Sequence, residues 1–146
     1  MTKILDFVEK SLNDTENNAA EFSLGVISNS HGQRIAAITN LKTISGAEKI
    51  LTAHSIRHAF VRHSSKKLEL ERGQIALEKS DFDLLPDIIS NPTTIERGDN
   101  QNRKRNEVIK LSKNIKGRLY TALFSVVYSE KEGTRLFFNT MFIKKK

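Results

Sequence analysis

The chain has 146 residues, of which 38% are hydrophobic and 28% are charged, a balance typical of one globular domain. It contains no cysteine, which excludes disulfides and thiolate metal sites. The first residues lack the pattern of a secretory signal, and no apolar run approaches membrane-spanning length. We therefore expect a soluble domain with no membrane partner, either free in the cytoplasm or part of a longer carrier chain.

The positive charge of the chain is unevenly distributed. Twenty-four Lys and Arg against 17 Asp and Glu give a net charge of +7. The first 21 residues are acidic overall, whereas most cations lie from Arg57 onward, including the runs Arg103–Arg105 and Lys144–Lys146. Basic groups gain affinity for nucleic acid because binding releases condensed counterions. Charge alone is equally compatible with a solubilising surface.

The N-terminal segment reads as a helix followed by a linker. Ile4, Leu5, Val8 and Leu12 are spaced to share one helix face over residues 2–12. Residues 13–20 are polar and rich in asparagine. We interpret 1–20 as an appendage and 21–146 as a single domain.

The next segments predict a hairpin and then a helix. The short apolar runs 21–28 and 33–39 flank Asn29-Ser30-His31-Gly32, a sequence that favours a tight reversal, with His31 as a polar loop residue. Residues 47–53 are ambiguous. Ser55 is a candidate N-cap for a helix that ends near His63, and residues 64–67 then form a polar loop.

The second half of the chain predicts mostly strands. Residues 72–77 look extended, and Ser80 is a candidate N-cap for a helix ending before Asn91, although Pro86 favours a turn first and a helix after it. The runs 93–96, 107–111, 119–128 and 134–143 are β-branched or aromatic. We therefore predict an α+β fold in which two to three N-terminal helices precede a four-stranded antiparallel sheet.

Three of the four histidines fall within ten residues: His54, His58 and His63. Histidine exchanges protons near neutral pH, so it suits cleavage of a phosphodiester by 2′-hydroxyl attack. That reaction also needs cations against the developing negative charge, and the nearby candidates are Arg57, Arg62 and Arg72.

Other interpretations of these histidines remain open. His54 and His58 lie four residues apart and could bind zinc from one helix. The HExxH pattern is absent, however, and the adjacent Arg57 would repel a metal ion, so we expect no metal site. His54 and His58 could equally be surface residues of a basic helix. His63 ends the apolar stripe and faces inward, where a purely structural histidine is the alternative.

Two further motifs contain candidate site residues. Gly73 permits an unusual backbone turn, and Arg72 can offer a planar fork to phosphate, unless it simply forms a surface pair with Glu71. Thr140 alternates with Phe138 and Phe142 along one strand face, which would place a polar atom at a cleft. An ordinary strand threonine is the alternative.

Together, these motifs resemble a known group of nucleases. A helix ending in His63 is followed by Glu69-Leu70-Glu71-Arg72-Gly73-Gln74-Ile75, by Ser80-Asp81-Phe82-Asp83-Leu84-Leu85-Pro86-Asp87-Ile88-Ile89 and by Asn139-Thr140-Met141-Phe142. This order, over residues 47–146, resembles the phage nuclease families grouped with barnase, EndoU, colicin-type tRNases and RelE.

The resemblance implies cleavage of RNA without a metal or cofactor, giving a 2′,3′-cyclic phosphate. It implies that His63 acts as general base or acid, that Arg72 contacts the scissile phosphate and that Thr140 lines the cleft, with His58 as a further catalytic candidate. We expect RNA-binding cations at Arg57, Arg62, Arg103, Lys104, Arg105 and Lys116.

The resemblance also implies partners. Members of these families are often toxins carried on phage head proteins or secreted carriers, so RNA (with tRNA as one candidate), an immunity protein and a larger carrier are the expected partners. The site of action would be the cytoplasm of a host or target cell. Two other functions remain open: a non-catalytic RNA-binding module that uses 103–105 and the lysine tail, and a phage structural domain.

Overall fold

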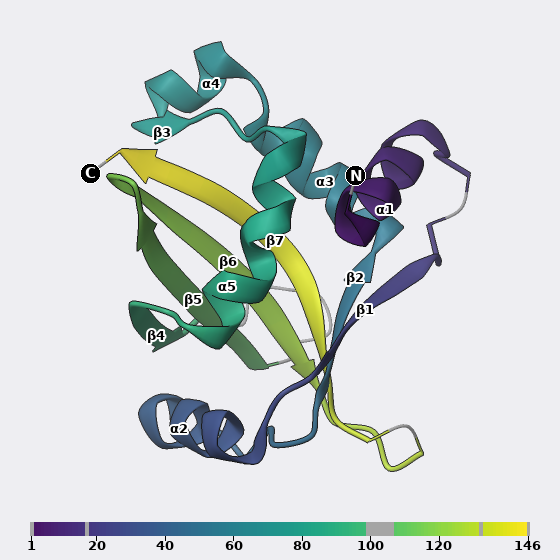
Figure 1. Cartoon of the computed structure of the whole chain (residues 1–146), viewed down its shortest axis with the longest axis vertical. Helices are drawn as coiled ribbons and strands as arrows, with labels where there is room; N and C mark the ends of the chain where they lie inside the picture. Colours follow the sequence, from purple (N-terminus) through teal and green to yellow (C-terminus); the bar gives the residue numbers. More distant parts are fainter. Residues whose placement is uncertain (1, 17, 99–106, 132, 146) are drawn as a thin grey trace.

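The computed structural model describes residues 2–16, 18–98, 107–131 and 133–145. Figure 1 shows a twisted sheet with helices packed around it. The strands run in the order β1-β2-β7-β6-β5-β4, and β3 pairs with β7. Their bounds are β1 (Glu21–Val26), β2 (Glu48–Thr52), β3 (Gln74–Ile75), β4 (Thr94–Arg97), β5 (Glu107–Ile115), β6 (Arg118–Val127) and β7 (Arg135–Lys145).

The four C-terminal strands form the predicted antiparallel meander. β4 pairs with β5, β5 with β6 and β6 with β7, each antiparallel. Lys116 and Gly117 form the two-residue connection of β5 to β6, with φ of 50° and 79°. Positive φ at both central residues matches the twist of a tight hairpin.

The prediction of a four-stranded antiparallel sheet is wrong, because the sheet is larger and mixed. β2 joins the edge of β7 in parallel, with Glu48 opposite Arg135, and β1 extends the sheet beyond β2. β3 pairs antiparallel with the other end of the same edge, where Gln74 lies opposite Lys144. These pairings join residues far apart in the chain, so no local sequence pattern indicates them.

The helices differ from the prediction more than the C-terminal strands do, in both number and position. They are α1 (Lys3–Asn13), α2 (Asn29–Thr39), α3 (Ala53–His63), α4 (Lys66–Glu71), the 3₁₀ helix η1 (Lys79–Leu84) and α5 (Leu85–Ser90). No helix of the described residues has the length and apolar character needed to cross a membrane.

Helix α1, predicted as part of an appendage, packs into the domain. Val8 is fully buried in the main core, and Thr2 caps the helix while its hydroxyl donates to Asp83, 2.6 Å away. Arg57 of α3 donates to the carbonyls of Ser11 and Asp14 at the end of α1. The domain boundary at residue 20 stays a prediction.

The predicted hairpin over 21–39 is wrong, because its second half is helix α2. Ser28 caps this helix by accepting from the backbone N–H of His31, and Ile35 lies in the core. A Cβ on Gly32 would come within 2.5 Å of Ser45, so this glycine allows a close approach of helix and loop rather than a turn. His31 Nε2 lies 2.6 Å from the carbonyl of Ile89.

Two smaller predictions are corrected between α3 and β4. Residues 64–67 do not form only a loop, since Ser65 caps α4 through its hydroxyl. Glu78 rather than Ser80 is the N-cap of η1, and its backbone N–H donates to Asp81 Oδ2 at 2.7 Å. The expected turn before the helix is present as η1, and Pro86 lies in the first turn of α5, where proline is tolerated.

The core lies on one face of the sheet. Phe82 of η1 packs edge-on against Phe138 of β7, which packs in turn on Phe124 of β6. Leu85 and Ile88 of α5 are fully buried in the same cluster. The residues that alternate with the core side chains of β5–β7 face the other side, and the candidate site lies there.

Candidate active site

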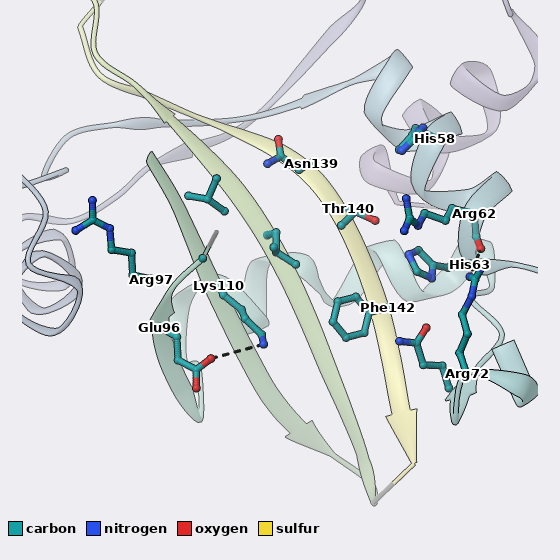
Figure 2. A pocket seen from close by; sticks show the side chains of 14 residues that line it. His58, Arg62, His63, Arg72, Glu96, Arg97, Lys110, Asn139, Thr140 and Phe142 are labelled. Atoms are coloured by element: carbon teal, nitrogen blue, oxygen red, sulfur yellow. Dashed lines mark hydrogen bonds and ion pairs between the residues drawn. The ribbon is translucent and has the colours of Figure 1, made fainter. Parts of the chain in front are cut away.

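An open cavity of about 660 Å³ lies between the end of α3 and the uncovered face of the sheet. Figure 2 shows His58, Arg62, His63 and Arg72 on one side of it and Glu96, Arg97 and Lys110 on the other, with Thr140 and Phe142 between them. The remaining lining residues are Gln74, Gly98, Val108, Leu123 and Asn139. We call the side formed by α3, α4 and β3 the helical wall and the side formed by β4–β7 the sheet wall.

A β-bulge in β7 builds the floor of the cavity. Leu123 pairs with Thr140 but the next residue, Phe124, pairs with Phe138, so Asn139 is the extra residue. The bulge reverses the alternation of faces. Phe138 therefore packs in the core while Thr140 and Phe142 face the cavity. The prediction that all three share one face is wrong, because regular alternation assumes an unbroken strand.

His63 is fixed at the last residue of α3. Its helix is anchored by the buried side chains of Ile56 and Ala59, and its carbonyl accepts from the backbone N–H of Leu77 at 2.7 Å. The His63 side chain is 7% exposed, and its ring centroid lies 5.8 Å from that of Phe142. The helix end and the contact with β7 thus hold the ring at the edge of the cavity.

Glu69 connects the polar groups of the helical wall. This fully buried carboxylate lies on α4, with Oε2 3.2 Å from His63 Nδ1 and Oε1 2.6 Å from Arg72 Nη1. Arg72 Nη1 also donates to the carbonyl of Arg62 at 3.0 Å. A buried carboxylate needs such partners, because an unpaired charge away from water is costly.

The environment of His63 favours its neutral form. Burial lowers the pKa of His63 below 6.5, and the nearby Arg62 and Arg72 lower it further, while the hydrogen bond and charge of Glu69 act in the opposite direction. With Nδ1–H donating to Glu69, Nε2 carries the lone pair. The arrangement therefore provides an oriented proton acceptor at neutral pH.

Cations surround the cavity on both walls. Arg62 and Arg72 belong to the helical wall, and Lys110 and Arg97 to the sheet wall. Lys110 Nζ lies 3.6 Å from Glu96, and Arg97 Nη2 lies 2.5 Å from Glu107. Arg72 uses Nη1 for Glu69 and Arg62, which leaves its other guanidinium nitrogens for a ligand. The arrangement suits a phosphodiester.

The structure brings together five of the predicted site residues: His58, Arg62, His63, Arg72 and Thr140. Arg57 instead holds the end of α1, and Lys116 lies in the β5–β6 turn, outside the cavity lining. Arg103, Lys104 and Arg105 lie outside the described residues. Arg72 pairs with Glu69 and not with Glu71, its alternative partner in the sequence.

The zinc interpretation finds no support among the described residues. The His54 and His58 rings are stacked 6.2 Å apart, and no group of three or more histidines and carboxylates in the described part of the chain could hold a metal ion.

Sequence reasoning missed the roles of Glu69, Gln74 and Lys110. The available signal for Glu69 was its i,i+3 spacing from Arg72, which places both on one helix face. That signal depended on recognising α4 as a helix. Lys110 faces the cavity because it pairs with Leu123 across β5 and β6, a contact that one strand alone does not indicate.

Comparison with known proteins gives one finding. The family model described as phage-Barnase-EndoU-ColicinE5/D-RelE like nuclease3 matches residues 25–146. No curated protein and no solved structure matches. The match covers most of the chain and includes every element that lines the cavity. The chain therefore belongs to the phage-Barnase-EndoU-ColicinE5/D-RelE like nuclease 3 family, whose members are enzymes that cleave nucleic acid.

Proposed function

We propose that the protein is a metal-independent endoribonuclease that cleaves RNA by 2′-hydroxyl attack and leaves a 2′,3′-cyclic phosphate. The observation that carries this proposal is the His63–Glu69 pair at the edge of a cationic cavity. A neutral histidine oriented by a buried carboxylate is a general base, and the surrounding guanidinium and ammonium groups match a phosphate.

In the proposed reaction, His63 Nε2 takes the proton of the 2′-hydroxyl. The resulting oxygen attacks the adjacent phosphorus, the bond from phosphorus to the 5′-oxygen breaks, and that oxygen takes a proton from solvent. Glu69 stabilises the imidazolium that forms on His63, because its carboxylate accepts from Nδ1. General-base catalysis of this kind contributes about 10²- to 10⁴-fold.

The cations act on the same phosphorus. Arg62, the unused nitrogens of Arg72, and Lys110 surround the cavity where negative charge develops as the fifth oxygen approaches. Groups fixed before the substrate arrives need little reorganisation during the reaction. Glu69 fixes Arg72 before the substrate arrives, because its Oε1 pairs with Arg72 while its Oε2 pairs with His63. One carboxylate therefore orients both the general base and a phosphate-binding cation.

The mechanism restricts the substrate to RNA, because a deoxyribose carries no 2′-hydroxyl. The test incubates the purified protein with tRNA, rRNA and single-stranded DNA of matched sequence in EDTA. We expect cleavage of RNA only, with cyclic phosphate on the 5′ fragments and 5′-hydroxyl ends on the 3′ fragments. DNA cleavage, or loss of RNA cleavage in EDTA, would contradict the proposal.

The matched variants are His63→Ala and His54→Ala. His54 lies on the same helix, is exposed and does not line the cavity. We expect His63→Ala to lose at least 100-fold in kcat/KM and His54→Ala to keep the activity of the parent. RNA that all three proteins bind without cutting would instead support a binding module.

A further inference from the structure

Two buried polar atoms of the cavity have no hydrogen-bond partner. Within the described part of the chain, the buried side-chain atoms that lack a hydrogen-bond partner are Gln74 Oε1 and Thr140 Oγ1. Both residues line the cavity. Buried polar groups are almost always paired, and leaving one unpaired costs free energy. Because both residues line one cavity, a ligand bound there is a common partner for both atoms.

Strand geometry fixes both side chains in the cavity. Gly73, with φ of 71°, turns the chain from α4 into β3, where Gln74 lies opposite Lys144 and Ile75 opposite Ile143. The bulge at Asn139 places Thr140 in the cavity. Because both residues lie on hydrogen-bonded strands, their unpaired atoms do not result from a loop caught in one of many conformations.

The two atoms differ in the partners that they can take from an RNA. A phosphate oxygen only accepts hydrogen bonds, so the Thr140 hydroxyl can donate to it but Gln74 Oε1 cannot bind it. Gln74 Oε1 needs a donor. RNA offers two kinds, the 2′-hydroxyl and the N–H groups of the bases, and His63 takes the proton of the 2′-hydroxyl in the proposed function. A base N–H remains for Gln74.

Two other polar side chains of the sheet wall have partners within the protein. The amide of Asn139 is hydrogen-bonded to the Ser125 hydroxyl, with contacts of 2.8 and 3.0 Å. The Glu96 carboxylate is paired with Lys110. Phe142 lines the same part of the cavity as His63, with ring centroids 5.8 Å apart, and an aromatic ring offers a surface for an unstacked base.

We propose that Gln74 reads the nucleobase at the cleavage site and that Thr140 donates to its phosphate. Gln74 is then a specificity-determining residue, and the substrate is an unpaired nucleotide in a single-stranded region of RNA. This inference rests on the proposed function for its assignment of the 2′-hydroxyl to His63. It predicts that the protein cuts after some bases much more often than after others.

The first test measures cleavage sites. An unstructured RNA that contains every dinucleotide is cut by the parent, Gln74→Met and Thr140→Val, and the cuts are mapped by sequencing. Methionine keeps the length of glutamine but has no amide. We expect the parent to prefer its best base over its worst by about tenfold or more, and Gln74→Met to lose most of that preference. Thr140→Val should slow cutting after all bases equally.

The second test does not depend on cleavage. Calorimetry measures the affinity of the four 3′-nucleoside monophosphates for the same proteins, whose folding is checked by thermal unfolding. We expect the parent to prefer one base by about tenfold, and folded Gln74→Met to bind all four alike. If Gln74→Met does not fold, Gln74→Glu takes its place: its carboxylate keeps an acceptor oxygen at this position, so folded Gln74→Glu should retain the base preference of the parent.

The outcomes separate the two proposals. RNA cleavage by the parent with equal cutting after every base, or an unchanged preference in folded Gln74→Met, overturns the inference and leaves the ribonuclease intact. Base-selective binding of nucleotides by a parent that cuts no RNA supports the subsite and overturns the proposed function.

Discussion

The two walls of the cavity differ in how their polar groups are held. On the helical wall, His63, Glu69 and Arg72 are hydrogen-bonded to one another before any ligand is present. On the floor and sheet wall, Thr140 Oγ1 has no partner, and Lys110 is only loosely paired with Glu96 at 3.6 Å. On the helical wall, Gln74 of β3 is the exception, because its Oε1 atom also has no partner.

This difference separates two tasks within one cavity. A network completed by the protein itself keeps its geometry when the substrate is absent, which suits proton transfer. Atoms without protein partners gain theirs from the substrate, which suits recognition. Substitutions in the network should therefore shift the pH dependence of cleavage, whereas substitutions outside it should leave that pH dependence in place and change how the substrate is bound.

Among the substitutions that compare the two walls, Glu69→Gln has the largest expected effect. It removes the negative charge that raises the pKa of His63 and replaces the carboxylate with a weaker, neutral acceptor, so the acid limb of the kcat/KM profile should move to lower pH, further below 6.5. The rate should fall about a hundredfold, because the imidazolium loses its counter-charge. Glu71→Gln is the control, since Glu71 is exposed and outside the cavity lining. An acid limb that stays in place, in a variant that folds, would contradict a Glu69-coupled base.

A smaller loss, of about 10- to 100-fold, is expected for Arg72→Ala. The shift of the acid limb should have the opposite sign, because Arg72 lowers the pKa of His63 and its removal lets that pKa rise. The pH–rate profile is compared with that of Arg34→Ala, a change at an exposed position on α2 that leaves the cavity intact. If the acid limb lay at the same pH in Arg72→Ala and Arg34→Ala, Arg72 would not influence the pKa of His63.

The smallest effect is expected for Lys110→Met on the sheet wall. This change should weaken RNA binding about tenfold and reduce the slope of log affinity against log salt by about 1, while the acid limb stays where it is in the parent. Lys67→Met on α4 is the control, since Lys67 is exposed and does not line the cavity. If the acid limb shifted in Lys110→Met, the sheet wall would also influence proton transfer, and the proposed division of tasks between the two walls would be wrong.

The sequence predicted one wall of the site better than the other. Arg62, His63 and Arg72 lie within eleven residues, so local periodicity and motif order were enough to group them. The C-terminal strands were also predicted, because each is β-branched or aromatic and bounded by turn residues. Thr140 was placed at the cleft by an argument from regular alternation, although a bulge is what turns it there.

The missed features depend on contacts between distant residues. The pattern Asn29-Ser30-His31-Gly32 matches a reversal, but packing of Ile35 in the core and of Gly32 against Ser45 favours a helix. The parallel pairing of β2 with β7 has no local signature. Glu69 is a charged residue in a polar stretch, and only the docking of α4 beneath His63 gives it the partners that make its burial possible.

The attachment of β3 to β7 also has a consequence for the order in which the protein becomes active. Gln74 and Ile75 pair with Lys144 and Ile143, which are synthesised long after them. Until those residues leave the ribosome, the segment that carries Glu69 and Arg72 has no strand to dock on. A ribosome-bound chain that extends only through β6 therefore has His63 but not its assembled wall. The helical wall is accordingly complete only after nearly all of the residues through β7 have been synthesised.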